Sequence, residues 1–70
     1  MSRPTFTADE IAAVMRVSGD TIRRQVRDGE LPKIPGLGKQ VRIRREDAEA
    51  RFGPITDEMV DAALAERGAA

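Results

Sequence analysis

The chain of 70 residues contains no cysteine, no histidine, no tryptophan and no tyrosine, and only two phenylalanines. Without cysteine there is neither a disulfide nor a thiol nucleophile, and without cysteine and histidine the usual zinc sites are excluded. The sequence also lacks a glycine-rich phosphate loop, and its carboxylates are scattered along it. We therefore expect no enzymatic activity, no cofactor and no metal ion.

Long apolar runs are also absent. No run approaches the roughly 20 residues that cross a membrane, and the first residues lack the apolar stretch of a signal peptide. Together with the absence of cysteine, this favours a cytoplasmic protein without membrane contact. A chain of this length is expected to fold as a single domain, residues 1–70, with a small core.

The charges are unevenly distributed, although the formal net charge is zero. Residues 18–45 carry eight basic and three acidic side chains, whereas residues 46–70 carry two basic and seven acidic ones. A basic middle segment is typical of a face that binds nucleic acid, and the acidic end indicates a different role for that end. Chance clustering is the alternative interpretation.

Residues 17–29 predict a short helix with a marked start and end. Ser18 is a favourable N-cap, and Val17 and Ile22 have the spacing of a hydrophobic staple. Gly29 follows the last turn, where a left-handed residue commonly ends a helix. Ile22 faces a core, and the polar side chains fall roughly opposite it.

The polar side of this predicted helix has residue types that suit DNA. Arginine can pair with both acceptors of guanine in the major groove and can also bind phosphate. Threonine can contact a phosphate or a thymine methyl, and aspartate can accept from the amino group of cytosine. The side chains concerned are Asp20, Thr21, Arg23, Arg24 and Arg27. The alternative is a solvated helix face without a ligand.

A second helix is predicted before this one, over residues 8–15. Thr7 and Glu10 have the pattern of a capping box at its start. The apolar side chains expected to be buried are Ile11, Ala12 and Met15. A connector of three residues, 16–18, then joins the two helices, which is typical of a helix-turn-helix unit.

A β-hairpin is predicted after this unit. Val41 and Ile43 alternate with polar residues, which is the period of a half-buried strand. Proline and glycine residues separate this strand from an irregular first strand over residues 31–34, with the tip near residues 36–39. Beside a helix-turn-helix unit such a hairpin is a wing that follows phosphates or enters the minor groove. Its basic side chains are Lys33, Lys39 and Arg42. A structural hairpin with solvated lysines is the alternative.

Two further helices are predicted toward the end of the chain. The first covers residues 44–52, although Arg44 is a poor N-cap. The second covers residues 55–67, with Thr56 as its N-cap. Its apolar stripe consists of Met59, Val60, Ala63 and Leu64. This stripe either covers the core or contacts another protein.

The chain contains four phrases in order: Thr7-Ala8-Asp9-Glu10-Ile11-Ala12, Val17-Ser18-Gly19-Asp20-Thr21-Ile22-Arg23-Arg24, Asp28-Gly29-Glu30-Leu31-Pro32 and Arg42-Ile43-Arg44-Arg45-Glu46-Asp47. Together they resemble the excisionase-type, MerR-like winged-helix family over about residues 5–52. The resemblance implies a mainly α fold with a small β-hairpin, a winged helix-turn-helix followed by a C-terminal helix. The sequence departs from the family at Gln25, where a buried tryptophan is frequent, and at Arg51, where an aromatic residue is common.

The resemblance also implies a set of DNA contacts. Major-groove contacts fall on Asp20, Thr21, Arg23 and Arg24, a backbone or base contact on Arg27, and a minor-groove contact near Lys39 or Gln40, with Arg42 on the same wing.

Excisionases of this family are not enzymes. They bind repeated sites beside an attachment site, bend the DNA and direct a tyrosine integrase toward excision. We therefore expect a phage-type excisionase in a bacterial host cell, with double-stranded DNA, a tyrosine integrase and head-to-tail copies of itself as partners. Two alternatives stay open: a small MerR-like transcriptional regulator, and an adaptor that binds protein.

Overall fold

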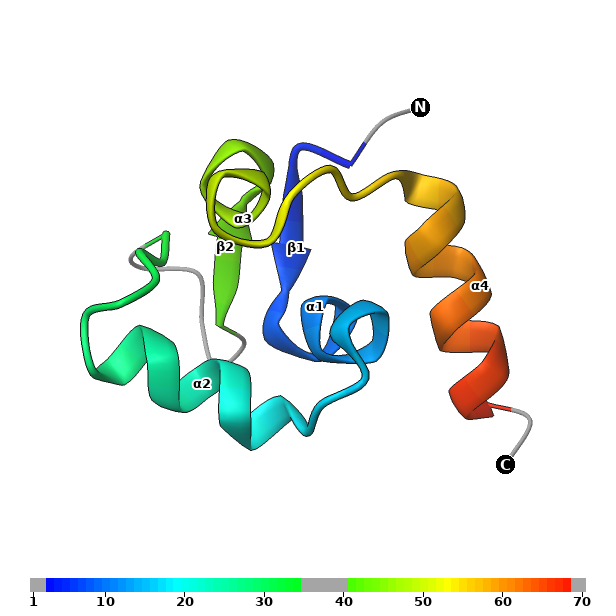
Figure 1. The fold of residues 1–70 in the computed structure, drawn as a ribbon, viewed down its shortest axis with the longest axis horizontal. Helices are drawn as coiled ribbons and strands as arrows, with labels where there is room; N and C mark the ends of the chain where they lie inside the picture. Colours follow the sequence, from blue (N-terminus) through cyan, green and yellow to red (C-terminus); the bar gives the residue numbers. More distant parts are fainter. Residues whose placement is uncertain (1–2, 35–40, 69–70) are drawn as a thin grey trace.

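In the computed structural model, which describes residues 3–34 and 41–68, four helices surround a two-stranded antiparallel sheet (Figure 1). The order is β1 (Thr5–Thr7), α1 (Ala8–Met15), α2 (Gly19–Arg27), β2 (Arg42–Arg44), α3 (Arg45–Phe52) and α4 (Asp57–Gly68). Figure 1 shows α1 between α2 and α4, with α3 at the far end of the sheet. This mainly helical architecture confirms the predicted fold class, a winged helix-turn-helix with an additional C-terminal helix.

The capping box predicted at the start of α1 is present. Thr7 Oγ1 accepts a hydrogen bond from the Glu10 N–H at 3.1 Å, and Glu10 Oε1 accepts one from the Thr7 N–H at 2.7 Å. Two backbone donors at the helix start therefore have partners without any help from tertiary structure. The predicted bounds of α1, Ala8 to Met15, are confirmed.

The turn between α1 and α2 is made by a left-handed residue that is not glycine. Arg16 has φ 60° and ψ 41°. Its N–H donates to the Ala13 carbonyl at 3.3 Å, and the Val17 N–H donates to the Ala12 carbonyl at 3.0 Å. These two bonds close α1 in the manner of a Schellman motif and turn the chain into α2.

The strand pairing differs from the prediction. β2 pairs with β1, with Phe6 opposite Ile43, and the segment 31–34 that was predicted as its hairpin partner is not a strand. Ile34 nevertheless lies beside β2, because its N–H donates to the Arg42 carbonyl at 2.8 Å. β1 is three residues long, too short to show an alternating pattern in the sequence. The predicted hairpin tip, residues 36–39, lies outside the described residues.

Each helix and strand contributes at least one side chain to a single buried cluster. The cluster consists of Phe6, Ala8, Ile11, Ala12, Ile22, Leu31, Ile43, Ala48, Ile55 and Val60. Met15 was predicted to be buried, but its side chain is 37% exposed. α1 is covered on two sides, by α2 and α4, so its buried positions centre on Ile11 and Ala12 and its last residue lies at the edge.

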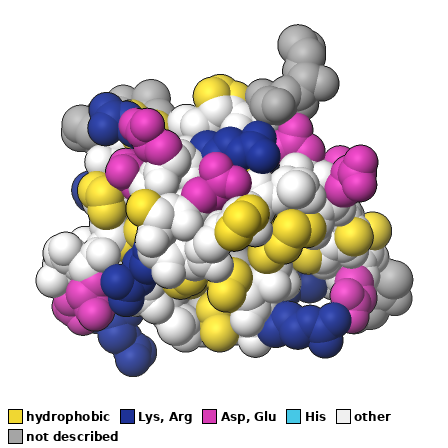
Figure 2. All heavy atoms as spheres, turned by 45° about the horizontal axis from the view of Figure 1, so that its top comes forward, with side chains coloured by type: hydrophobic (Ala, Val, Ile, Leu, Met, Phe, Trp, Pro, Cys, Tyr) yellow, Lys and Arg dark blue, Asp and Glu magenta, His cyan; other side chains and the backbone are white. Residues whose placement is uncertain are grey.

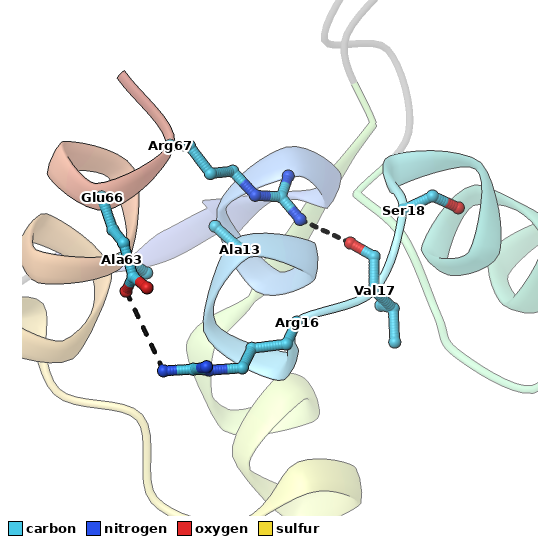
Figure 3. A pocket seen from close by; sticks show the side chains of 7 residues that line it. All are labelled: Ala13, Arg16, Val17, Ser18, Ala63, Glu66 and Arg67. Carbon is cyan, nitrogen blue, oxygen red and sulfur yellow. Dashed lines mark hydrogen bonds and ion pairs between the residues drawn. The ribbon is translucent and has the colours of Figure 1, made fainter. Parts of the chain in front are cut away.

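Polar contacts of two arginines attach α4 to the rest of the fold. Arg67 Nη2 donates to the Val17 carbonyl at 2.6 Å and to the Ala12 carbonyl at 3.3 Å, next to the turn between α1 and α2 (Figure 3). Arg3 Nη2 lies 2.6 Å from Asp61 Oδ1, near the start of α4. Within the described residues, no helix is long and apolar enough to cross a membrane.

The apolar stripe of α4 divides between core and surface. Val60 has no exposed surface and belongs to the buried cluster, so its predicted role as a protein contact is corrected here. Ala63 is half-buried. Met59 and Leu64 are 41% and 37% exposed, because successive positions of a helix are about 100° apart and only one side of α4 faces α1.

The left-handed backbone at Arg16 leads to a stability prediction. A residue with a Cβ pays about 1–2 kcal/mol for this conformation, whereas glycine does not, although glycine loses about 0.4–1 kcal/mol through the unfolded state. We expect Arg16→Gly to stabilise the protein by up to about 1 kcal/mol, which corresponds to a rise in Tm of roughly 4–8 °C. Thermal unfolding followed by circular dichroism measures this.

Arg16→Ala is the matched control, since it removes the same side chain but keeps a Cβ. Arg16 and Glu66 lie 3.9 Å apart with both side chains largely exposed, so loss of this ion pair has little effect. We expect Arg16→Ala to leave the Tm nearly unchanged. An equal rise in both variants would mean that the side chain, and not the backbone conformation, determines the effect.

Candidate functional site

α2 presents one side to the core and the other to solvent. Ile22 is buried and belongs to the core cluster, and Val26 is half-buried against it. On the opposite side the structure brings together four of the predicted DNA-contacting side chains, around a partly enclosed hollow of about 440 Å³. They are Asp20, Arg23, Arg24 and Arg27.

Both ends of α2 are closed by local interactions that the sequence predicts. Ser18 Oγ accepts from the Thr21 N–H at 3.2 Å. At the other end Gly29 has φ 81°, its N–H donates to the Val26 carbonyl at 3.1 Å, and the Glu30 N–H donates to the Gln25 carbonyl at 2.9 Å. This is a Schellman motif with glycine at its left-handed position.

The Arg23 guanidinium forms ion pairs with two carboxylates. Its Nη2 lies 2.7 Å from Asp20 Oδ1, one turn earlier on α2, and its Nη1 lies 3.2 Å from Asp9 Oδ1 on α1. The hydrogen bond from Arg23 lowers the pKa of Asp20, and the hydrogen bond to Asp20 raises the pKa of Arg23. Asp9 was not singled out as a site residue from the sequence, because nothing in its local pattern shows that α1 and α2 bring it beside Arg23.

Arg24 and Arg27 differ from Arg23 in having no such partner. Both are exposed, and neither forms an ion pair or a side-chain hydrogen bond with any residue in the described parts of the chain. They are neighbours on the helix surface, since they are three residues apart. Their guanidinium groups therefore keep all of their donors for an external ligand.

The other predicted contacts are in different situations. Thr21 is half-buried, and its hydroxyl lies 2.9 Å from Ser18 Oγ, so it takes part in the start of the helix. Arg42 is half-buried in β2, which leads out of the predicted wing. Lys39 and Gln40 lie outside the described residues.

The two positions that depart from the family pattern are bonded to each other. Arg51 Nε on α3 donates to Gln25 Oε1 on α2 at 2.9 Å. The same guanidinium lies 5.8 Å from the centre of the Phe52 ring and 3.5 Å from a carboxylate oxygen of Glu30. A polar bridge thus holds the last turns of α2 against α3, at the positions where the resemblance led us to expect aromatic side chains.

Two other arginines are used inside the fold. Arg45 lies 3.6 Å from Glu49 and 3.6 Å from Asp57, and it donates to the Ile55 carbonyl at 3.0 Å. Arg3 contacts Asp61, as described above, and also Glu10 at 3.2 Å. Their charges are balanced by neighbouring carboxylates, in contrast to Arg24 and Arg27 on α2 and to Arg44 on β2, which are exposed and have no partner among the described residues. Within the described residues, no three His, Cys, Asp or Glu side chains could hold a metal ion together.

A second surface feature is a group of exposed hydrophobic side chains. Figure 2 shows hydrophobic side chains gathered in the middle of one face, with charged side chains of both signs around them. The large hydrophobic side chains exposed within the described residues are Met15, Met59 and Leu64. Two of the three belong to α4, the helix whose stripe was predicted either to cover the core or to contact a protein.

Comparison with protein families gives one match: a family model described as a helix-turn-helix domain matches residues 5–50. This range includes β1, α1, α2, β2 and most of α3. Comparisons with curated proteins and with solved structures gave no match.

The ion pair of Asp20 can be tested by its titration. An unperturbed aspartate has a pKa of about 3.9, and we expect Asp20 in the folded protein to titrate below that value. In Arg23→Ala its pKa should return upward, whereas Arg24→Ala, one residue along, should shift it less because the Arg24 charge is the minor cause. Carboxyl chemical shifts followed by NMR through the acid range measure this.

The sign of the linked stability follows from the lowered pKa. The Asp20 carboxylate adds to the free energy of unfolding at pH values above its pKa in the unfolded chain. This added stability is lost as the pH falls through the lower pKa that Asp20 has in the folded protein. An Asp20 pKa that is the same in the wild type and in Arg23→Ala would show that the pair does not form in solution.

Proposed function

The chain belongs to the helix-turn-helix domain family and is therefore a sequence-specific DNA-binding protein, and from this premise we propose that α2 enters the major groove as the recognition helix. The observation that carries the proposal is the pair Arg24 and Arg27, exposed and without partners among the described residues. The major groove admits one α-helix, and an arginine there can bind guanine or phosphate.

The predicted wing supplies the second part of the proposed interface. β2 follows residues 35–40 in the sequence, and the Ile34 N–H bond to the Arg42 carbonyl joins the described residues on either side of that segment. We propose that Lys39 and Gln40 contact the minor groove or its phosphates, with Arg42 beside them. Contacts of this kind add affinity and fix the orientation of α2 in its groove.

For the biological process, we propose that the protein acts as a phage-type excisionase. The support is the resemblance of its four sequence phrases to that family. In this role the protein binds tandem sites, bends attachment-site DNA and directs a tyrosine integrase toward excision. Bending costs on the order of 1–6 kcal/mol, which contacts between neighbouring copies and with integrase would offset. A small transcriptional regulator on the same fold is the alternative.

The exposed side of α4 is the surface that we propose for integrase or for a neighbouring copy. Met59 and Leu64 are exposed and flank the buried side of α4, with the half-buried Ala63 between them. Glu58 is also exposed on this helix, and the exposed Asp61 is paired with Arg3, so the surface combines apolar side chains with the acidic Glu58. This combination suits a partner that presents apolar and basic groups.

Charge reversal tests the recognition helix. Loss of an arginine that reads a base costs about 1–3 kcal/mol, and a glutamate adds repulsion from phosphates. We expect Arg24→Glu to weaken binding to the specific site by at least about tenfold and to lower the salt dependence of binding. Fluorescence anisotropy at several salt concentrations measures both.

Arg44→Glu is the matched control, since it makes the same change of charge at an exposed arginine on β2. Arg44 lies at the end of β2 that leads into α3, away from α2 (Figure 1). We expect a smaller effect from this variant. Binding that survives Arg24→Glu with unchanged salt dependence would exclude α2 as the recognition helix.

A genome-wide binding map in vitro separates the two processes. Purified protein is mixed with fragmented DNA from its own source at moderate salt, and the retained fragments are sequenced. We expect tandem sites beside an integrase gene and its attachment sequence. Sites scattered upstream of unrelated genes would replace the excisionase proposal with a transcriptional regulator. No enrichment at any salt concentration would contradict specific DNA binding and leave the surface of α4 as the main functional candidate.

A further inference from the structure

We propose that Asp9 of α1 and Asp20 of α2 withhold Arg23 from DNA, so that Arg23 positions α2 against α1 while Arg24 and Arg27 supply the arginine contacts of this helix. The inference rests on the proposed function of α2. It gives different roles to the adjacent Arg23 and Arg24, although the sequence predicts a DNA contact for both. It also assigns a role to Asp9, which belongs to a different helix.

The geometry of Arg23 is the first support. Two of its guanidinium nitrogens are engaged at once, Nη2 with Asp20 at 2.7 Å and Nη1 with Asp9 at 3.2 Å. The two carboxylates come from different helices, so the guanidinium bridges α1 and α2. Hydrogen bonds between charged groups are stronger than those between neutral ones, and here two of them act on one side chain.

Gly19 lies directly beside this contact. A Cβ at this position would collide with the Asp9 carboxylate and would lie 3.1 and 3.2 Å from the two terminal nitrogens of Arg23. Its φ is not in the left-handed region, so the backbone conformation does not require glycine here. The missing side chain leaves the space in which Asp9 and Arg23 meet, at the first position of α2.

The charge balance around Arg23 also supports this inference. Arg23 with its two carboxylates carries a net charge of −1, whereas Arg24 and Arg27 each carry an unbalanced positive charge. To reach a phosphate, Arg23 would have to leave both carboxylates facing the negatively charged DNA backbone. Arg24 and Arg27 can bind DNA without breaking an ion pair. Binding of phosphates and base acceptors by these two side chains is therefore more favourable than binding by Arg23.

Salt dependence is the readout that distinguishes a contact from a positioning role. The slope of log K against log salt concentration falls by about 0.9 for each phosphate contact that is lost. Binding of a labelled duplex that carries the most enriched sequence of the binding map is measured between about 50 and 200 mM salt. We expect Arg24→Ala to lower the slope by about 0.9 and Arg23→Ala to leave it unchanged, with a loss of affinity of a few fold. Circular dichroism confirms that each variant is folded.

Release of Arg23 is the second measurement, and a merely structural role would not produce it. In the double variant Asp9→Asn, Asp20→Asn, both carboxylates become neutral amides of the same shape. We expect the slope to rise by about 0.9 as Arg23 gains a phosphate. Adding Arg23→Ala to this double variant should remove the increase, which shows that the gain belongs to Arg23 and not to the loss of two negative charges.

The outcomes separate this inference from the proposed function. If Arg23→Ala lowers the slope as much as Arg24→Ala, or if the double variant gives no gain that depends on Arg23, the inference is wrong and α2 is still the recognition helix. If neither Arg24→Ala nor Arg27→Ala changes binding, the arginines of α2 do not contact DNA, and the proposed function fails together with the inference.

Discussion

The fold depends on the burial of α1. Ile11 and Ala12 have no exposed surface, and α2, α4 and β1 all pack against this one helix. Alanines on α1 allow the neighbouring helices to approach closely, while Phe6 and Ile43 fill the space beside it from the sheet. Burial of apolar surface contributes about 25 cal/mol per Å², and a chain of this size has little of it. The helices α2 and α4 therefore depend on their contact with α1, while α3 packs on the two strands.

The position of α2 follows from that arrangement. Ile22 anchors one side of the helix in the core, and polar bridges hold it at both ends. Near its start Arg23 reaches Asp9 on α1, and near its end Gln25 accepts from Arg51 on α3. A helix of nine residues has little stability of its own, so these neighbours determine which side chains it presents to solvent.

The packing of the elements also divides the arginines of the chain into two groups. Those that point across the fold neutralise carboxylates or bond to carbonyl groups, as Arg3, Arg45 and Arg67 do. Arg24, Arg27 and Arg44 are exposed, and no carboxylate among the described residues neutralises their charge. A protein with a formal net charge of zero can therefore still present positive charge to DNA at Arg24 and Arg27, because most of its carboxylates lie on other elements and Asp20 on α2 is paired with Arg23.

The sequence alone determined the local features of this protein. The capping box at Thr7, the N-cap at Ser18 and the left-handed Gly29 involve residues at most a few positions apart, so their patterns are readable without a fold. The bounds of α1 and the side of α2 that faces the core follow from such patterns, and the fold class follows from the order of the predicted elements together with the resemblance to a winged-helix family. They also placed Arg24 and Arg27 on the exposed side of α2. Only the tertiary structure decided the pairing of β1 with β2, the burial of Val60, the exposure of Met15 and the meeting of Asp9 with Arg23. Each of these brings together residues that are distant in the chain or selects one side of a helix over another, and the physical reason is that burial and charge pairing depend on distances in space that local spacing does not encode.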